Sequence, residues 1–226
     1  MNRFRLLFWG FCLFGLSLSA SAQELSNKGK EFWLTYPAHI DGTSSVMGLY
    51  ITSSVNTTGT IELAGGAPVT FNVQANVVTR IFLNSTGTGT VTGTSPIYFG
   101  LNTAVYQNQS NGVISKSGIR IASKDPLVVY AHIIRSARSA ATLALPTQVL
   151  GNEYIAPSMP STVTQASSSN GTLGGIGEIN VVATQPNTQI TVIPTAPGKN
   201  GEPVGQPIIV NLPNAGDCYQ LSLIHI

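Results

Sequence analysis

The chain has 226 residues, enough to bury one large hydrophobic core or two smaller ones. Charged residues make up only 9% of it, against about a quarter of a typical globular protein. No basic run or stripe is present, which excludes the electrostatic footprint of a nucleic-acid-binding protein.

Residues 1–22 are predicted to be a signal peptide. Arg3 and Arg5 form a basic start, an apolar run extends from Leu6 to Leu18, and small residues end the segment at Ala22. The apolar run is shorter than the ~20 residues that span a bilayer, so we expect cleavage before Gln23, export, and no membrane span in the mature chain. An uncleaved anchor is the alternative.

Loss of this segment changes the charge and the cysteine count. Both of its charged residues are arginines, so 9 of the 11 basic residues remain beside 9 acidic ones, and the formal charge becomes zero. Cys12 leaves with the segment, and Cys218 remains as the only cysteine. An intrachain disulfide and a cysteine-based metal site are therefore excluded, and we expect Cys218 to be buried and inert. Pairing with a foreign cysteine is the weaker alternative.

The stretch "KEFWLTYP" (30–37) predicts the first strand. Phe32, Leu34 and Tyr36 alternate with Trp33 and Thr35, so one face is strongly apolar and is expected to pack in a core. Pro37 is expected to end the pairing. Trp33 lies on the opposite face and is a candidate ligand contact.

Period-two alternation continues along the chain and predicts further antiparallel strands. A strand over 49–53, a turn at 56–59 and a strand over 60–63 are expected first, then strands over 69–73 and 77–81 as an outgoing and a returning strand. Another pair is expected over 119–122 and 127–133, joined by a Ser-Lys-Asp-Pro turn. The best short helix candidate, within 135–151, is interrupted by Pro146.

An internal repeat is visible. "YITSSVNTTGTI" (50–61) matches "VVATQPNTQITV" (181–192) without gaps at an offset of 131, and 68–82 match 207–221 at an offset of 139. The repeat predicts an all-β fold of repeated antiparallel β-sandwich-like units, with propeller-like blades as the alternative.

Four segments are therefore expected: the signal peptide 1–22, a first β-unit 23–160, a Ser/Thr/Gly-rich linker or long loop 161–176, and an incomplete second β-unit 177–226. The second copy has no counterpart of 118–133, and the tail 222–226 resembles translated adapter sequence. We expect the chain to be a C-terminally truncated fragment of a longer one.

No catalytic, cofactor or metal site is predicted. His39, His132 and His225 are far apart, and no G-x-S-x-G elbow is present. Glu31 and Glu153 could form a glycosidase-like pair only if the fold brought them together. Arg135 and Arg138 are the close pair of arginines in the mature chain. A solvated loop is the favoured interpretation, and recognition of an acidic glycan or carboxylate is the alternative.

Five ordered blocks, among them "GKEFWLTYP", "GIRIASKDPLVVYAHI" and "LALPTQVLGNEYIAPS", resemble the N-terminal domain of IgGFc-binding proteins. The resemblance covers nearly all of 29–221. It implies an exported, extracellular binding or adhesion module rather than an enzyme. Immunoglobulin binding is implied by the family name alone.

The sequence is consistent with three functions. The first is a secreted or cell-surface, non-enzymatic module that binds an extracellular protein or glycan. The second is an architectural β-repeat that spaces other domains. The third, a carbohydrate-processing enzyme, lacks a motif to support it. The weak candidate contacts are Trp33, Arg135 and Arg138, and no cofactor is expected.

Overall fold

The fold is described from a computed structural model. The structure describes residues 26–37, 44–63, 66–83, 97–98, 111–135, 138–157, 167–168, 171–172 and 177–223. The predicted signal peptide, His39 and His225 lie outside these residues. The predicted all-β class is confirmed, since the helical structure among the described residues is limited to short 3-10 turns such as Thr147–Val149. The strands are β1 (Gly29–Leu34), β2 (Val46–Thr52), β3 (Thr57–Leu63), β4 (Val69–Val73), β5 (Thr79–Phe82), β6 (Ile97–Tyr98), β7 (Gly112–Ile114), β8 (Ile119–Arg135), β9 (Arg138–Ala144), β10 (Ser167–Ser168), β11 (Gly171–Thr172), β12 (Gly177–Val182), β13 (Thr188–Val192), β14 (Ile208–Leu212) and β15 (Cys218–Leu223).

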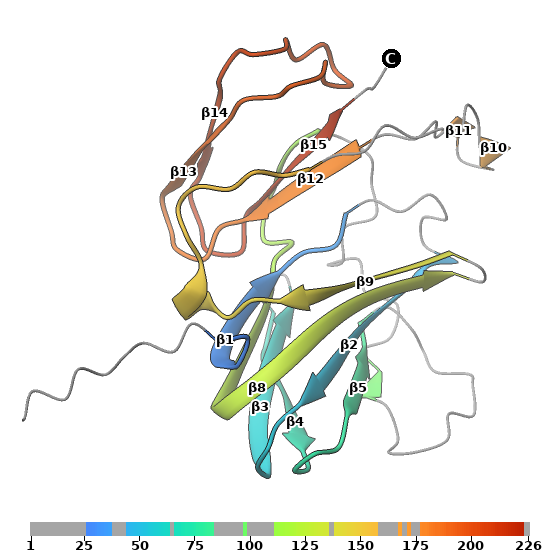
Figure 1. Cartoon of the computed structure of the whole chain (residues 1–226), viewed down its shortest axis with the longest axis vertical. Helices are drawn as coiled ribbons and strands as arrows, with labels where there is room; N and C mark the ends of the chain where they lie inside the picture. The colour runs from blue at the N-terminus through green and yellow to red at the C-terminus, as the bar shows by residue number, and fades with distance from the viewer. Residues whose placement is uncertain are drawn as a thin grey trace, which may run out of the picture.

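Strand β8 runs through the middle of an eight-stranded sheet (Figure 1). Its first part, Ile119–Ser123, pairs with β1 on one side and β3 on the other, and its last part pairs with β2 and β9. The predicted turn between two strands is therefore wrong. Pro126 cannot donate to a ladder, and Lys124–Pro126 is where one continuous strand changes neighbours. We call the part with β1, β3 and β4 half A, and the part with β2, β5, β6 and β9 half B.

The expected hairpins at 56–59 and between 73 and 77 are also wrong. β3 pairs antiparallel with the first part of β8, and β2 pairs antiparallel with its last part. On the side away from β8, β4 pairs with β3 and β5 pairs with β2. The chain reverses between Leu63 and Val69 instead. At the bend, the Ser53 hydroxyl donates to the Pro126 carbonyl at 2.9 Å, and the Thr57 hydroxyl donates to Asp125 Oδ2 at 3.0 Å. These bonds tie the bends of adjacent strands together.

The two halves curl around one hydrophobic core. Its largest side chains include Phe32 and Ile61 from half A and Met47, Leu49 and Ile81 from half B. Phe32, Leu34 and Tyr36 are buried, as the alternation of the first strand predicts. The Tyr36 hydroxyl donates to the Gly48 carbonyl at 2.7 Å and so links the end of β1 to β2.

Strands β12–β15 reproduce the pairing of the first copy. In the first copy Thr57 pairs with Val73 and Gly48 with Phe82. The repeat offsets predict that Thr188 pairs with Leu212 and Ile179 with Leu221 in the second copy, and both pairs are found. A second apolar cluster lies between these strands and contains Ala183, Leu212, Tyr219 and Leu221.

The gapless match nevertheless misplaces one face. In the first copy Leu49 and Ile81 are buried in the core, whereas Asn180 and Gln220 stand at the matching positions and their neighbours Ile179 and Leu221 join the apolar cluster. β12 and β15 therefore keep the pairing of the alignment, but the residues of these strands that join the apolar cluster are the neighbours of those that the alignment predicts.

Strand β7 connects the two copies, because it pairs with β15 and leads directly into β8. The Gly118 N–H donates to the Gly216 carbonyl at 2.8 Å. Asp217 is fully buried and accepts hydrogen bonds from the Lys116 N–H and the Asn214 N–H, both at 2.9 Å. Burial alone would raise the pKa of Asp217, but these hydrogen bonds lower it below its usual value.

Candidate binding surface

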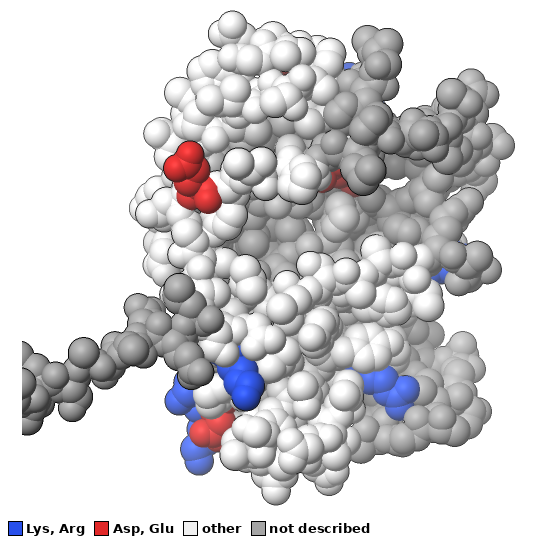
Figure 2. All heavy atoms as spheres, viewed as in Figure 1, with Lys and Arg blue, Asp and Glu red and all other residues white. Residues whose placement is uncertain are grey.

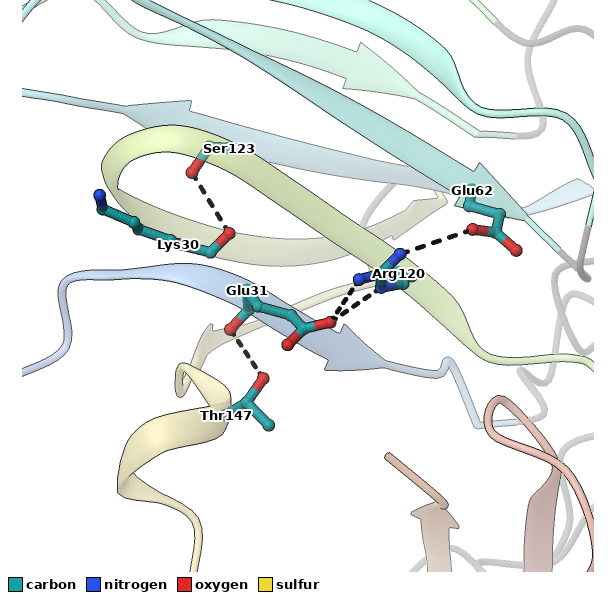
Figure 3. Close-up of polar contacts among 6 residues, drawn as sticks. All are labelled: Lys30, Glu31, Glu62, Arg120, Ser123 and Thr147. Carbon is teal, nitrogen blue, oxygen red and sulfur yellow. Dashed lines mark hydrogen bonds and ion pairs between the residues drawn. The ribbon is translucent and has the colours of Figure 1, made fainter. Parts of the chain in front are cut away.

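Trp33, the first predicted contact, lies on the outer face of half A beside Arg120. The two residues are direct partners on β1 and β8, and the Arg120 guanidinium carbon is 5.9 Å from the centroid of the Trp33 ring. Figure 3 shows Arg120 between two carboxylates from the neighbouring strands: Glu31 at 2.8 Å and Glu62 at 4.0 Å. Glu31 is therefore half of an ion pair with Arg120.

Trp33 also packs against the second copy. It is half-buried, and a Cβ atom on Gly216, in the turn before β15, would lie 3.1 Å from Trp33 Cζ3. Gly216 has a φ of 85°, which favours glycine, so its backbone comes close to the indole ring. This arrangement gives Trp33 a structural contact between the two copies.

A different surface presents aromatic side chains to solvent. Alternate residues of β8 point away from the core in half B, and there Tyr130 is 45% exposed and Ile134 is 38% exposed. Tyr50 of β2 is the direct partner of Tyr130, and the Tyr50 and His132 rings meet edge to face at 5.6 Å. We call Tyr50, Tyr130, His132 and Ile134 the tyrosine face.

The tyrosine face continues at its edges. Arg80 of β5 is the direct partner of Tyr50, and Leu143 of β9 is the direct partner of Tyr130. A cross-strand row of Arg80, Tyr50, Tyr130 and Leu143 thus crosses four neighbouring strands of the large sheet. Tyrosine rings with one apolar and one polar end suit contact with either protein or sugar surfaces.

The structure places the two predicted arginines where β8 ends and β9 begins. Arg135 follows Ile134 along β8, so by alternation it lies on the same side of the strand as Ala131 and Ile133 and not on the tyrosine face. Arg135 ends β8, is exposed, and pairs through its backbone with Arg138, which begins β9. Trp33 lies opposite Arg120, near the start of β8, and so is not brought together with these arginines.

The sequence alone does not identify Tyr50 and Tyr130 as candidate contacts. The alternation in "VVYAHI" separates Tyr130 and His132 from the core residues Val129 and Ala131, so that half of the signal was present. The sequence gives no signal for Tyr50 as the partner of Tyr130, because periodicity does not show that β2 lies beside β8.

The carboxylates of the described chain are engaged in structural contacts or stand singly. Asp125 accepts a hydrogen bond from the Thr57 hydroxyl, and Asp217 accepts one from the Asn214 N–H in the turn before β15. Glu202 accepts a hydrogen bond from the Asn111 side chain at 2.8 Å. No group of three or more His, Cys, Asp or Glu residues suited to a metal ion occurs among the described residues. Figure 2 shows few charged side chains on this side of the molecule, with Lys and Arg mainly over its lower part.

Comparison with known proteins identifies one family. Residues 140–224 match the model of the family described as IgGFc binding protein. The match runs from β9 to β15, and it confirms over these residues the resemblance seen in the sequence. Searches of curated proteins and of solved structures gave no significant match.

Cys218 is buried, as predicted, and burial raises the pKa of its thiol. Within the described residues, none of the helical structure is long and apolar enough to cross a bilayer.

Proposed function

We propose that this chain is a non-enzymatic binding module of an exported or cell-surface protein, and that it recognises an extracellular protein or glycan through the tyrosine face. The observation that carries the proposal is the cross-strand row of Arg80, Tyr50 and Tyr130 on the outer face of half B, in which Tyr130 is 45% exposed. Tyrosine and arginine are the residues that most often supply binding energy at protein surfaces. The family match to a binding protein supports the same class of function.

The first ligand to test is the Fc region of immunoglobulin, because the description of the matching family names it. A glycan is the second, because Tyr130 can pack against a sugar ring. Both ligands would use the same face of half B.

The test compares three proteins against immobilised Fc and a glycan array. Tyr130→Ser is expected to weaken binding about tenfold or more relative to the unchanged chain, which corresponds to about 1.4 kcal/mol. Val69→Ser is the matched control, because Val69 is 41% exposed but lies on β4 in half A. Its binding is expected to equal that of the unchanged chain.

Two results would contradict the proposal. If the unchanged chain bound neither Fc nor any glycan, an architectural role as a β-repeat spacer would be favoured. If Val69→Ser weakened binding as much as Tyr130→Ser, the ligand would not be recognised through the tyrosine face.

A further inference from the structure

Charged residues are distributed differently over the two halves of the large sheet. In half A the strands β1, β3 and β4 and the first part of β8 carry two basic residues, Lys30 and Arg120, and two carboxylates, Glu31 and Glu62. Glu31 and Glu62 both lie within 4.0 Å of Arg120, so the charge of this arginine is compensated inside the protein.

The strands of half B carry positive charge without a carboxylate. Arg80, Arg135 and Arg138 belong to them, and no Asp or Glu occurs in β2, β5, β6, β9 or the last part of β8. Without residues 1–22 the whole chain has equal numbers of acidic and basic residues. The excess of positive charge on these strands therefore favours an anionic ligand at this half of the molecule.

Arg80 is the arginine of half B that lies on the tyrosine face. It is the direct partner of Tyr50, and direct partners on antiparallel strands place their side chains on the same face of the sheet. Arg135 lies on the opposite side of β8 by alternation. Because a guanidinium has five N–H donors, Arg80 can keep its contact within the protein and still bind a carboxylate bidentately.

Aromatic rings surround Tyr50 on the same face. A Cβ atom on Gly48 would lie 3.0 Å from Phe82 Cδ1, so the Phe82 ring lies over Gly48. On its other side Gly48 is the direct partner of His132, whose ring meets the Tyr50 ring edge to face. The rings of Phe82, Tyr50, His132 and Tyr130 thus form an aromatic surface beside Arg80, and such rings pack well against the apolar faces of sugar rings.

The row of Arg80, Tyr50 and Tyr130 has the spacing of a short oligosaccharide. It crosses the adjacent strands β5, β2 and β8 (Figure 1). Neighbouring strands are about 4.8 Å apart, so Arg80 and Tyr130 are separated by roughly 10 Å. A carboxylated sugar ring bound at Arg80 would place the next ring of its chain over the tyrosines. One arginine among aromatic rings also matches an acidic glycan, in which carboxylates are separated by uncharged rings.

We propose that the tyrosine face binds a glycan that carries a carboxylate, in the form of a uronic or a sialic acid, and that Arg80 selects the acidic sugar. The inference rests on the proposed function, because it names the class of ligand for the same face. It adds Arg80 as the residue that determines specificity.

The first test compares acidic and neutral forms of the same sugar. Isothermal titration calorimetry of the whole chain uses a hyaluronan hexasaccharide, whose carboxylates are uronic acids, and the same hexasaccharide with its carboxyl groups reduced to alcohols. Sialyllactose and lactose form the second pair, which tests sialic acid. In at least one pair the acidic form is expected to bind about tenfold more tightly than the neutral form.

The second test changes the arginine. Arg80→Gln is expected to weaken binding of the preferred acidic glycan about tenfold and to leave binding of its neutral form unchanged. Arg80→Lys keeps the charge but loses the bidentate geometry, so a loss of about threefold is expected. Arg135→Gln is the matched control, an exposed arginine off the tyrosine face, and should bind as the unchanged chain does. Circular dichroism and thermal unfolding show whether each variant is folded.

Equal affinity for the acidic and neutral members of both pairs would overturn the inference, and this comparison needs no variant. Arg80→Gln with the affinity of the unchanged chain would overturn it as well.

Tyr130→Ser separates this inference from the proposed function. Weaker glycan binding by Tyr130→Ser together with unchanged binding by Arg80→Gln would reject the inference alone, whereas unchanged binding by both variants would reject both proposals. Binding of Fc that depends on Tyr130, without binding of any glycan, would make the ligand a protein and would also reject the inference alone.

Discussion

Glu178 shows how one side chain can make the stability of this fold depend on pH. It lies on β12, partly withdrawn from solvent, and burial raises the pKa of its carboxyl to about 7 although the charge of Lys199 opposes the shift. The folded protein therefore holds a proton that the unfolded chain releases near pH 4.5. Stability is full below that pH and decreases as the pH rises through about 7.

Glu178→Gln should remove this dependence. The variant is expected to be more stable than the unchanged chain at pH 8, by roughly 1–3 kcal/mol, and nearly equal to it at pH 4.5. Urea unfolding followed by circular dichroism at both pH values measures the difference. A gain of the same size at both pH values would show that the Glu178 proton is not responsible.

Among the strands, β3 illustrates how a glycine sets the spacing of a sheet. Gly59 faces Phe71 on β4 and Ser123 on β8, and a Cβ atom there would lie 2.5 Å from Phe71 Cζ and 2.7 Å from the Ala122 carbonyl oxygen. In the second copy the same opposed pair is Ile190 and Val210. The strand that has glycine in the first copy therefore has a large residue in the second, and the residue opposite it is smaller than phenylalanine.

Gly59→Ala should therefore destabilise the protein by about 2 kcal/mol, because the Ala122 carbonyl belongs to the backbone and cannot turn aside. Gly151→Ala is the matched control, since a Cβ there meets its nearest atom at 3.9 Å. Chemical denaturation of both variants provides the comparison. Equal stability of the two variants would show that β3 and β8 can move apart without cost.

Alternation along each strand predicted which side chains are buried, but it did not predict which strands are neighbours. Phe32, Leu34 and Tyr36 are in the core as expected, because a period of two fixes the two faces of a strand. The same period fits a hairpin and a bent strand equally well, so the turns expected at 56–59 and 123–126 were wrong. Arg135 was identified as a candidate contact, whereas Tyr50 required knowledge of the β2–β8 pairing.

For the whole molecule, Asp217 is one of the side chains that couple the two copies. It accepts from Lys116, which precedes β8, and from Asn214 in the turn before β15. Because its pKa is lowered, the stability that it contributes is present above about pH 4 and is lost as the pH falls further.

Asp217→Asn places an amide donor against groups that are themselves donors. We expect a loss of about 2–3 kcal/mol at pH 7 and a fall in Tm of several degrees. Differential scanning calorimetry measures both, with Glu153→Gln as an exposed acidic control that should change stability by less than about 0.5 kcal/mol. An unchanged Tm for Asp217→Asn would mean that the contact contributes little to the junction.

The central position of β8 constrains how the protein can reach its native state. Gly29 pairs with Leu127 and Val46 with Ile134, so β1 and β2 gain these neighbours only after residue 134 has been synthesised. Contacts so distant along the chain close large loops, and such topologies fold slowly. Until then the growing polypeptide carries apolar strands without their final partner, and a chaperone that holds extended segments would raise the yield of folded protein.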